Sequence, residues 1–243
     1  MLKTGESRQS DNTESNMEEK DTIKAFVSER EMEDGRESCL VRALEDANVL
    51  YSKKEVLQRI ADLLNSSNEE DNCEVEKLLN QMQNIPFLSL VGYLILLDLI
   101  GEVFSTKSNI VKAIDSFGSE ELKEHKWTVN ALRNSLAHNY GLVNIPNNKA
   151  HDSNSLHKFT LIDGSNKEDK IFERERTPTR KSIWSDKSED TSTKVYVPTL
   201  IKEIEKLYRT LKQEVENGNY KLCLSGGIEE LKSRFTIIKV KES

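Results

Sequence analysis

Apolar residues recur at intervals of three and four along most of this chain, the spacing that places side chains on one face of an α-helix. The pattern first appears through Leu40, Val41, Leu44, Ala47 and Leu50. Only short segments alternate between apolar and polar residues as strands do, so the pattern predicts a mostly α fold. Helices are expected over residues 36–50, 52–64, 67–82, 85–104, 109–117, 119–140 and 198–216.

Several predicted helix starts carry residues that satisfy free backbone N–H groups. Ser52 is followed three residues later by Glu55, which is the spacing of a capping box. Ser67 and Glu70 repeat this spacing. Ser119 precedes two acidic residues, which the positive end of the helix dipole favours. We therefore expect separate helices to begin at residues 52, 67 and 119.

The segment 85–104, IPFLSLVGYLILLDLIGEVF, is the most apolar part of the chain. Its length is close to that of a membrane span, but Asp98 and Glu102 interrupt it, and a charged side chain within a bilayer is costly. We therefore expect no membrane insertion and interpret the segment as the central helix of a helical bundle. Its predicted core positions are Leu90, Leu94, Leu97 and Ile100.

The two ends of the chain differ in character from the middle. Residues 1–35 are polar and acidic, and we expect them to form a disordered or weakly helical tail with a short helical stretch around residues 22–32. Residues 36–243 are expected to form one helical domain. That domain includes a closing helix over 198–216 and a C-terminal extension over 219–243 with a short helix and a last β-rich piece.

A long insertion, residues 144–195, precedes the closing helix and lacks helical spacing. Residues 158–162 and 194–197 alternate between apolar and polar side chains, as short strands do. These two pieces are able to pair with each other. The sequence therefore predicts a helical bundle with a short β-hairpin or loop insertion before its last long helix.

The bulk composition narrows the function classes. Of 243 residues, 35 are basic and 42 acidic, for a net charge of −7, so no basic coat for nonspecific nucleic-acid binding is present. Cys39, Cys73 and Cys223 are odd in number and widely spaced, which argues against a disulfide framework and a zinc site. No cofactor or metal is expected. The N-terminus lacks a signal-peptide core, so we expect a cytoplasmic setting.

The run Arg133-Asn134-Ser135-Leu136-Ala137-His138-Asn139-Tyr140 is the most informative stretch of the sequence. Arginine carries a permanent charge in a fork that matches phosphate oxygens, and histidine exchanges protons near neutral pH. Together they supply the groups needed to cut RNA without a metal: one neutralises the phosphate while the other moves a proton. We therefore treat Arg133 and His138 as candidate catalytic residues.

The two candidate groups do not converge on one regular helix. At about 100° per residue, Val129, Leu132, Leu136 and Tyr140 form an apolar stripe. Arg133 falls at the edge of that stripe, and His138 falls on the far side near Asn134. Either the helix is distorted at the motif, or a second copy completes the site across a twofold axis.

Each feature also has a plainer interpretation. An arginine at the edge of an apolar stripe often extends its charge to solvent, and an outward histidine is often just surface. Asp98, within the apolar segment, is more often a hydrogen-bonded core residue. It is able to orient Arg133 if the two helices pack together.

The insertion contains a second, weaker candidate. A short basic run lies close before Trp184, and such a patch beside an aromatic suits single-stranded RNA. An ordinary solvated loop explains the same charges. The candidate RNA-binding residues are Arg174, Arg176, Arg180 and Lys181.

The motif, on a helix of a helical bundle, resembles the signature of the HEPN superfamily: an Arg, a polar residue, three variable residues and a His. This resemblance implies that Arg133, Asn134 and His138 are the motif residues. Many members are metal-independent endoribonucleases that act as dimers in toxin–antitoxin, abortive-infection and CRISPR-linked defence systems. Tyr140 resembles the modified tyrosine of toxins paired with a nucleotidyltransferase antitoxin.

The resemblance implies a homodimeric endoribonuclease, a toxin or defence effector whose partners are RNA and an antitoxin or regulatory protein. His138 would act as general base or acid and Arg133 would stabilise charge on the phosphate, leaving a 2′,3′-cyclic phosphate. The alternative is a noncatalytic HEPN-like helical dimer that binds protein or RNA, because some HEPN domains are catalytically silent.

Overall fold

The computed structural model describes residues 8–64, 85–105, 109–139, 141–145, 156–164, 170–174 and 192–238. The helix expected over 67–82 lies outside these residues. The helices are α1 (Arg8–Ser28), α2 (Cys39–Leu64), α4 (Ile85–Phe104), α5 (Ile110–Phe117), α6 (Glu120–Glu124), α7 (Lys126–Asn139), α10 (Val197–Glu216) and α11 (Gly227–Arg234). The strands are β1 (Arg36–Ser38), β2 (Val143–Asn144), β3 (His157–Ile162), β4 (Phe172–Arg174), β5 (Thr193–Tyr196) and β6 (Thr236–Ile238).

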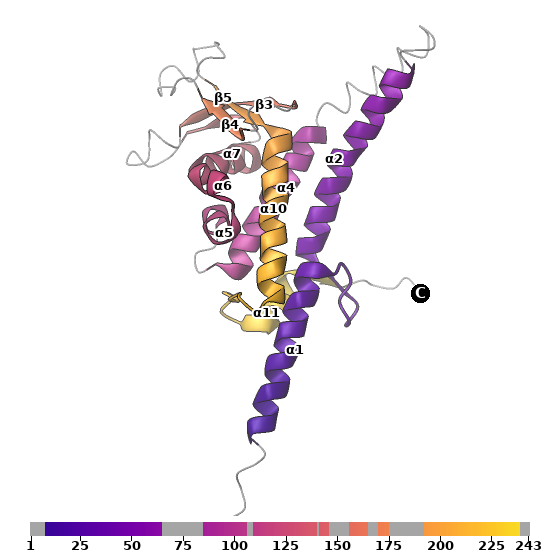
Figure 1. The fold of residues 1–243 in the computed structure, drawn as a ribbon, viewed down its shortest axis with the longest axis vertical. Coiled ribbons are helices and arrows are strands. Elements are labelled where there is room, and N and C mark those ends of the chain that lie inside the picture. Colours follow the sequence, from indigo (N-terminus) through magenta and orange to yellow (C-terminus); the bar gives the residue numbers. More distant parts are fainter. Residues whose placement is uncertain are drawn as a thin grey trace, which may run out of the picture.

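The fold is mostly helical, as predicted, and its long helices form a bundle. In Figure 1, α10 runs through the middle, with α2 on one side and the stack of α5, α6 and α7 on the other. α4 lies behind α10, and the larger sheet covers one end of the bundle. α1 and α2 extend beyond the bundle at opposite ends, so the molecule is elongated.

α4 is the central helix, and its predicted core positions are confirmed. Leu90, Leu94, Leu97 and Ile100 are each at most 2% exposed. In the described part of the chain, one helical window, Phe87–Phe104, is long and apolar enough to cross a membrane by length and composition, and 56% of it is buried. The core helix of a bundle is buried by its neighbouring helices, so this burial supports the interpretation of α4 as a core helix rather than a membrane span.

The N-terminal segment, expected to be a disordered or weakly helical tail, contains the helix α1 over Arg8–Ser28, which starts well before the helical stretch expected around residues 22–32. Ile23, Phe26 and Val27 are fully buried, and Met32 is 5% exposed just beyond the helix. These apolar residues pack into the main core. The last turns of α1 overlap the helical stretch expected around residues 22–32, and this packing anchors them.

α2 is one continuous helix, so the predicted break at Ser52 is wrong. Ser52 is exposed within the helix. Tyr51 packs against the core one turn after buried Ala47, so the apolar face continues past the predicted boundary. A capping residue stabilises a helix start only where the backbone is already interrupted, and here packing keeps the helix intact.

The expected helix over 119–140 is two helices, α6 and α7, separated by His125. Its predicted start is confirmed, since the Ser119 hydroxyl accepts a hydrogen bond from the backbone N–H of Leu122. The His125 ring contacts Phe172 of β4 edge-on, with ring centroids 5.3 Å apart. A contact with a strand some fifty positions away is not visible in local periodicity.

The insertion forms a mixed sheet of order β2-β3-β5-β4 rather than the predicted hairpin. β3 and β5 do pair, but they run parallel, whereas β4 is antiparallel to β5. Glu173 of β4 joins these strands, because its carboxylate accepts hydrogen bonds from Tyr196 at 2.6 Å and from Lys194 at 3.1 Å. These bonds lower the pKa of Glu173.

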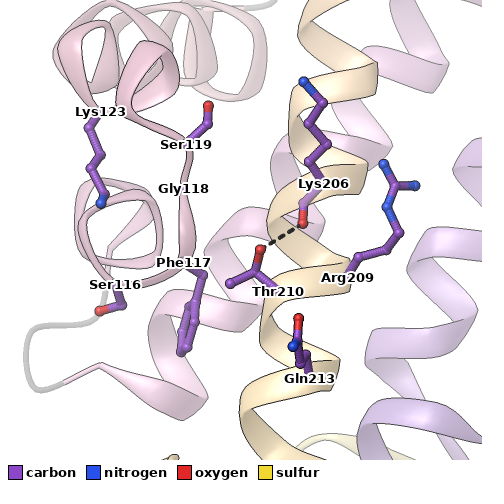
Figure 2. Close-up of a pocket in the computed structure, with 9 residues that line it drawn as sticks. All are labelled: Ser116, Phe117, Gly118, Ser119, Lys123, Lys206, Arg209, Thr210 and Gln213. Carbon is purple, nitrogen blue, oxygen red and sulfur yellow. Dashed lines mark hydrogen bonds between the residues drawn. The ribbon is translucent and has the colours of Figure 1, made fainter.

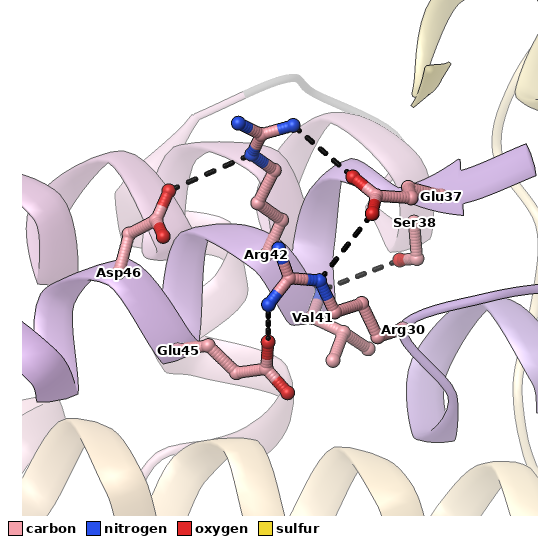
Figure 3. Close-up of polar contacts among 7 residues, drawn as sticks. All are labelled: Arg30, Glu37, Ser38, Val41, Arg42, Glu45 and Asp46. Carbon is pink, nitrogen blue, oxygen red and sulfur yellow. Dashed lines mark hydrogen bonds and ion pairs between the residues drawn. The ribbon is translucent and has the colours of Figure 1, made fainter. Parts of the chain in front are cut away.

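A second, two-stranded sheet pairs β1 with β6 and so joins the two ends of the domain. Glu37, the middle residue of β1, is 3% exposed, and its carboxylate oxygens lie 3.4 Å from Arg30 Nε and 3.1 Å from Arg42 Nη1 (Figure 3). Both arginines also pair with carboxylates of α2. This network fixes the turn between α1 and α2.

Candidate functional site

α7 carries the motif, and its apolar stripe is buried as predicted. Val129, Leu132 and Leu136 are at most 2% exposed and belong to the main core. Tyr140, the fourth predicted member, lies outside the described residues. Burial of this face against α4 and α5 orients the rest of the helix, and Arg133, Asn134 and Ala137 remain partly exposed.

Arg133 and Asp98 form an ion pair that joins α7 to α4. The Arg133 Nε donates to Asp98 Oδ2 at 2.6 Å, and both side chains are 27% exposed. Asp98 is one of two acidic residues in the mostly apolar helix α4, and the packing of α4 against α7 places its carboxylate beside Arg133. The expectation that Asp98 orients Arg133 if the two helices pack is confirmed in its geometry.

Asn134 extends this arrangement along α7. Its Oδ1 accepts a hydrogen bond from Arg133 Nη1 at 3.0 Å. Charge-assisted hydrogen bonds are stronger and more directional than neutral ones, so the carboxylate and the amide together orient the guanidinium plane. The candidate site is therefore an oriented cation at a half-buried position, with a neutral amide beside it.

His138 lies in the last turn of α7, and its side chain lies outside the described residues. α7 is an uninterrupted α-helix from Lys126 to Asn139, which includes both Arg133 and His138. Five positions along such a helix correspond to a rotation of about 140°. The break at His125 precedes the motif, so it does not bring these two positions together.

The predicted basic patch in the insertion is described only at Arg174, since Arg176, Arg180 and Lys181 lie outside the described residues. Arg174 is partly buried on β4 and donates from Nη2 to the Leu156 carbonyl at 2.8 Å. Among the described residues its buried Nε has no hydrogen-bond partner. Burial lowers the pKa of the Arg174 guanidinium. An inward guanidinium does not favour contact with RNA phosphates.

An exposed apolar stripe follows the outer face of α4, next to the candidate site. Leu88 is 50% exposed and Ile95 is 47% exposed, two turns apart on the same face. Val91 and Leu99 lie on this side and are partly buried. Because Asp98 lies at the edge of this stripe, a partner that covers it also approaches Arg133.

A pocket that the sequence analysis missed lies between the α5–α6 turn and α10 (Figure 2). Its cations are Lys123, Lys206 and Arg209. Lys123 lies on α6, some eighty positions before Lys206 and Arg209 on α10. No local sequence motif connects residues so far apart. Only the packing of α10 against α5 brings them to one cavity.

Comparisons with known proteins do not place the chain in a family: no family model, no curated protein and no solved structure matches it. The evidence for function is therefore the motif and the geometry around it.

Proposed function

We propose that this protein is a HEPN-like, metal-independent endoribonuclease that acts in the cytoplasm as a homodimer, as a toxin or defence effector. The observation that carries the proposal is the oriented guanidinium of Arg133, held by Asp98 at 2.6 Å and by Asn134 at 3.0 Å. A cation fixed in this way at a partly exposed position is suited to stabilise charge on a phosphate in the transition state.

In the proposed reaction, His138 removes the proton from a ribose 2′-hydroxyl. The 2′-oxygen attacks the adjacent phosphorus, and the bond from phosphorus to the 5′-oxygen breaks. That oxygen takes up a proton, giving one product with a 2′,3′-cyclic phosphate and one with a 5′-hydroxyl. Arg133 stabilises the negative charge on the phosphate oxygens, and Asn134 positions the guanidinium or the phosphate.

The regularity of α7 supports the proposed dimer. Because about 140° separates positions 133 and 138 on a regular helix, a complete site is expected to combine Arg133 of one protomer with His138 of the other. The exposed stripe of Leu88 and Ile95 supplies an apolar surface for this contact. Ile95→Glu is expected to give a monomer by light scattering. Val49→Glu, at an equally exposed residue of α2, is expected to remain dimeric.

RNA cleavage in EDTA tests the catalytic proposal. His138→Ala is expected to reduce the rate by about 10²–10⁴-fold, the usual contribution of general acid–base catalysis. Arg133→Lys keeps the charge but loses the fork held by Asp98, so it is also expected to reduce the rate. A parent protein that never cuts RNA, or a His138→Ala variant that cuts normally, contradicts the proposal.

Mixing inactive variants tests the shared site. Heterodimers of Arg133→Ala and His138→Ala contain one intact composite site and one doubly defective site. Partial recovery of cleavage on mixing is therefore expected. No recovery, in mixtures shown to exchange subunits, means that each site lies within one protomer.

A noncatalytic helical dimer that binds a partner protein or RNA is the second candidate. The ion pair of Arg133 with Asp98 favours it to the extent that the pair serves to join α7 to α4. Its signature is a dimer that binds its partner while EDTA-resistant cleavage is absent. The regulatory partner expected of a toxin is an antitoxin or similar protein.

A further inference from the structure

The pocket between the α5–α6 turn and α10 has a volume of about 500 Å³, within the range of small-molecule sites. In Figure 2, Lys123 extends from α6 on one side, and Lys206 and Thr210 stand on α10 on the other. None of the described lining residues belongs to α7. The pocket is thus distinct from the candidate ribonuclease site.

The lining of the pocket contrasts with the composition of the chain. The protein carries a net charge of −7. Among the described residues that line the pocket, however, three are cationic and none is acidic. Most of the others bear hydroxyl or amide groups, including Ser116, Thr210 and Gln213. Side-chain amide and hydroxyl groups are donors suited to phosphate oxygens, and those of Gln213 and Ser116 lie at the pocket, whereas the Thr210 hydroxyl already donates to the Lys206 backbone carbonyl at 3.1 Å.

Two of the pocket cations, Lys123 and Arg209, form only weak ion pairs with nearby carboxylates. Lys123 pairs with Glu120 at 2.9 Å, but Glu120 is 89% exposed, and such solvated pairs contribute little. Arg209 lies 4.0 Å from Glu205 and is 63% exposed. In Figure 2, Arg209 extends from the side of α10 that faces away from Lys123, so it must turn to reach a ligand in the pocket, and its weak pairing with Glu205 leaves it able to do so.

Lys206, unlike the other two cations, forms an ion pair with a buried carboxylate, that of Glu203, which is 3% exposed. The other oxygen of Glu203 accepts a hydrogen bond from Ser119 at 2.6 Å. Glu203 thus ties α10 to the α5–α6 turn and holds Lys206 at the pocket. The two walls are fixed relative to each other before any ligand binds, which lowers the entropic cost of binding.

The pocket offers charge but no aromatic face. Phe117 is 8% exposed and packs edge-on against Phe104, with ring centroids 6.5 Å apart. A planar base therefore has no surface to stack on among the described lining residues. Recognition by separated cations and hydroxyl groups favours a ligand whose charge is high and spread over several phosphates.

We propose that this pocket binds a compact ligand with two or more linked phosphate groups, contacted by Lys123, Lys206 and Arg209. The site is independent of the ribonuclease proposal. Inorganic pyrophosphate is the simplest probe of this chemistry, and tripolyphosphate extends it. Binding is expected to weaken as salt rises, because the contacts are largely electrostatic.

Titration calorimetry with pyrophosphate tests the site in the full-length protein. Lys123→Gln and Arg209→Gln are each expected to weaken binding about tenfold, the usual effect of losing one charged hydrogen bond. Thr210→Glu, which places a carboxylate on the exposed pocket wall, is expected to abolish binding. Lys221→Gln, an exposed lysine outside the pocket, serves as the matched control and is expected to bind normally.

Melting temperatures of the variants show whether each one is folded, and Lys206 is left in place because it neutralises buried Glu203. Three results overturn the proposal: no saturable binding of pyrophosphate by the parent protein, an equal loss in Lys221→Gln, or equal affinity for orthophosphate. The last result would mean that the pocket recognises a single phosphate rather than a linked pair.

Discussion

Replacing Asp98 and Arg133 by alanine, singly and together, measures how strongly α4 and α7 are joined at the candidate site. Their Nε–Oδ2 distance is 2.6 Å, and each side chain is 27% exposed, so the pair is neither fully solvated nor fully buried. Solvated pairs contribute about 0.2–1 kcal/mol, and hydrogen bonds to charged groups about 1.5–3 kcal/mol. We therefore expect a coupling free energy of about 1–2 kcal/mol in a double-mutant cycle.

Urea unfolding of the four proteins gives this coupling directly. The cycle for Glu120 and Lys123 is the matched control, because Glu120 is 89% exposed. Its coupling is expected to stay below about 0.5 kcal/mol and to vanish in 1 M salt, whereas the coupling of the partly buried pair largely persists. A coupling below about 0.3 kcal/mol between Asp98 and Arg133 would refute the reasoning that Asp98 orients the guanidinium.

Three further predictions concern the fold that supports this site. Leu94→Ala is expected to lower the free energy of unfolding by about 2–5 kcal/mol, since Leu94 is buried in the core helix; a loss below about 1 kcal/mol in urea unfolding would contradict its burial. Gly101→Ala is expected to destabilise by about 1–3 kcal/mol, because its Cβ would clash with the backbone carbonyl that begins α5. Gly92→Ala, in the same helix, meets the Cβ of Ala47 at 3.0 Å and its Cα at 3.5 Å, distances longer than the corresponding approach at Gly101, so equal unfolding midpoints for the two glycine variants would contradict the close approach at Gly101. The pKa of Glu173 is lowered from 4.5, so the stability that it contributes is present above pH 4.5 and is lost as the pH falls through its folded value. Glu173→Gln is therefore expected to flatten the acid limb of the melting-temperature profile, and an unchanged limb would show that Glu173 does not contribute.

Some features of the candidate site could be predicted from the local sequence pattern, and others depend on how the helices pack. The motif residues on α7 and the buried stripe of Val129, Leu132 and Leu136 were visible in the sequence, because helical spacing records which side chains share a face. The pairing of Arg133 with Asp98 was only a possibility in the sequence. Its realisation depended on how α4 and α7 pack, across thirty-five positions.

Apolar spacing by itself determined the positions of α4, α5 and α10 and the mostly helical fold, since residues within four positions of one another decide whether a helix has a buried face. It did not determine the break at His125, the continuity of α2 past Ser52 or the parallel direction of β3 and β5. The tertiary structure decided these features, because each depends on contacts between residues far apart in the chain. The tertiary structure also decided the pocket of Lys123 and Lys206, because these charges come together only when α10 packs against α5.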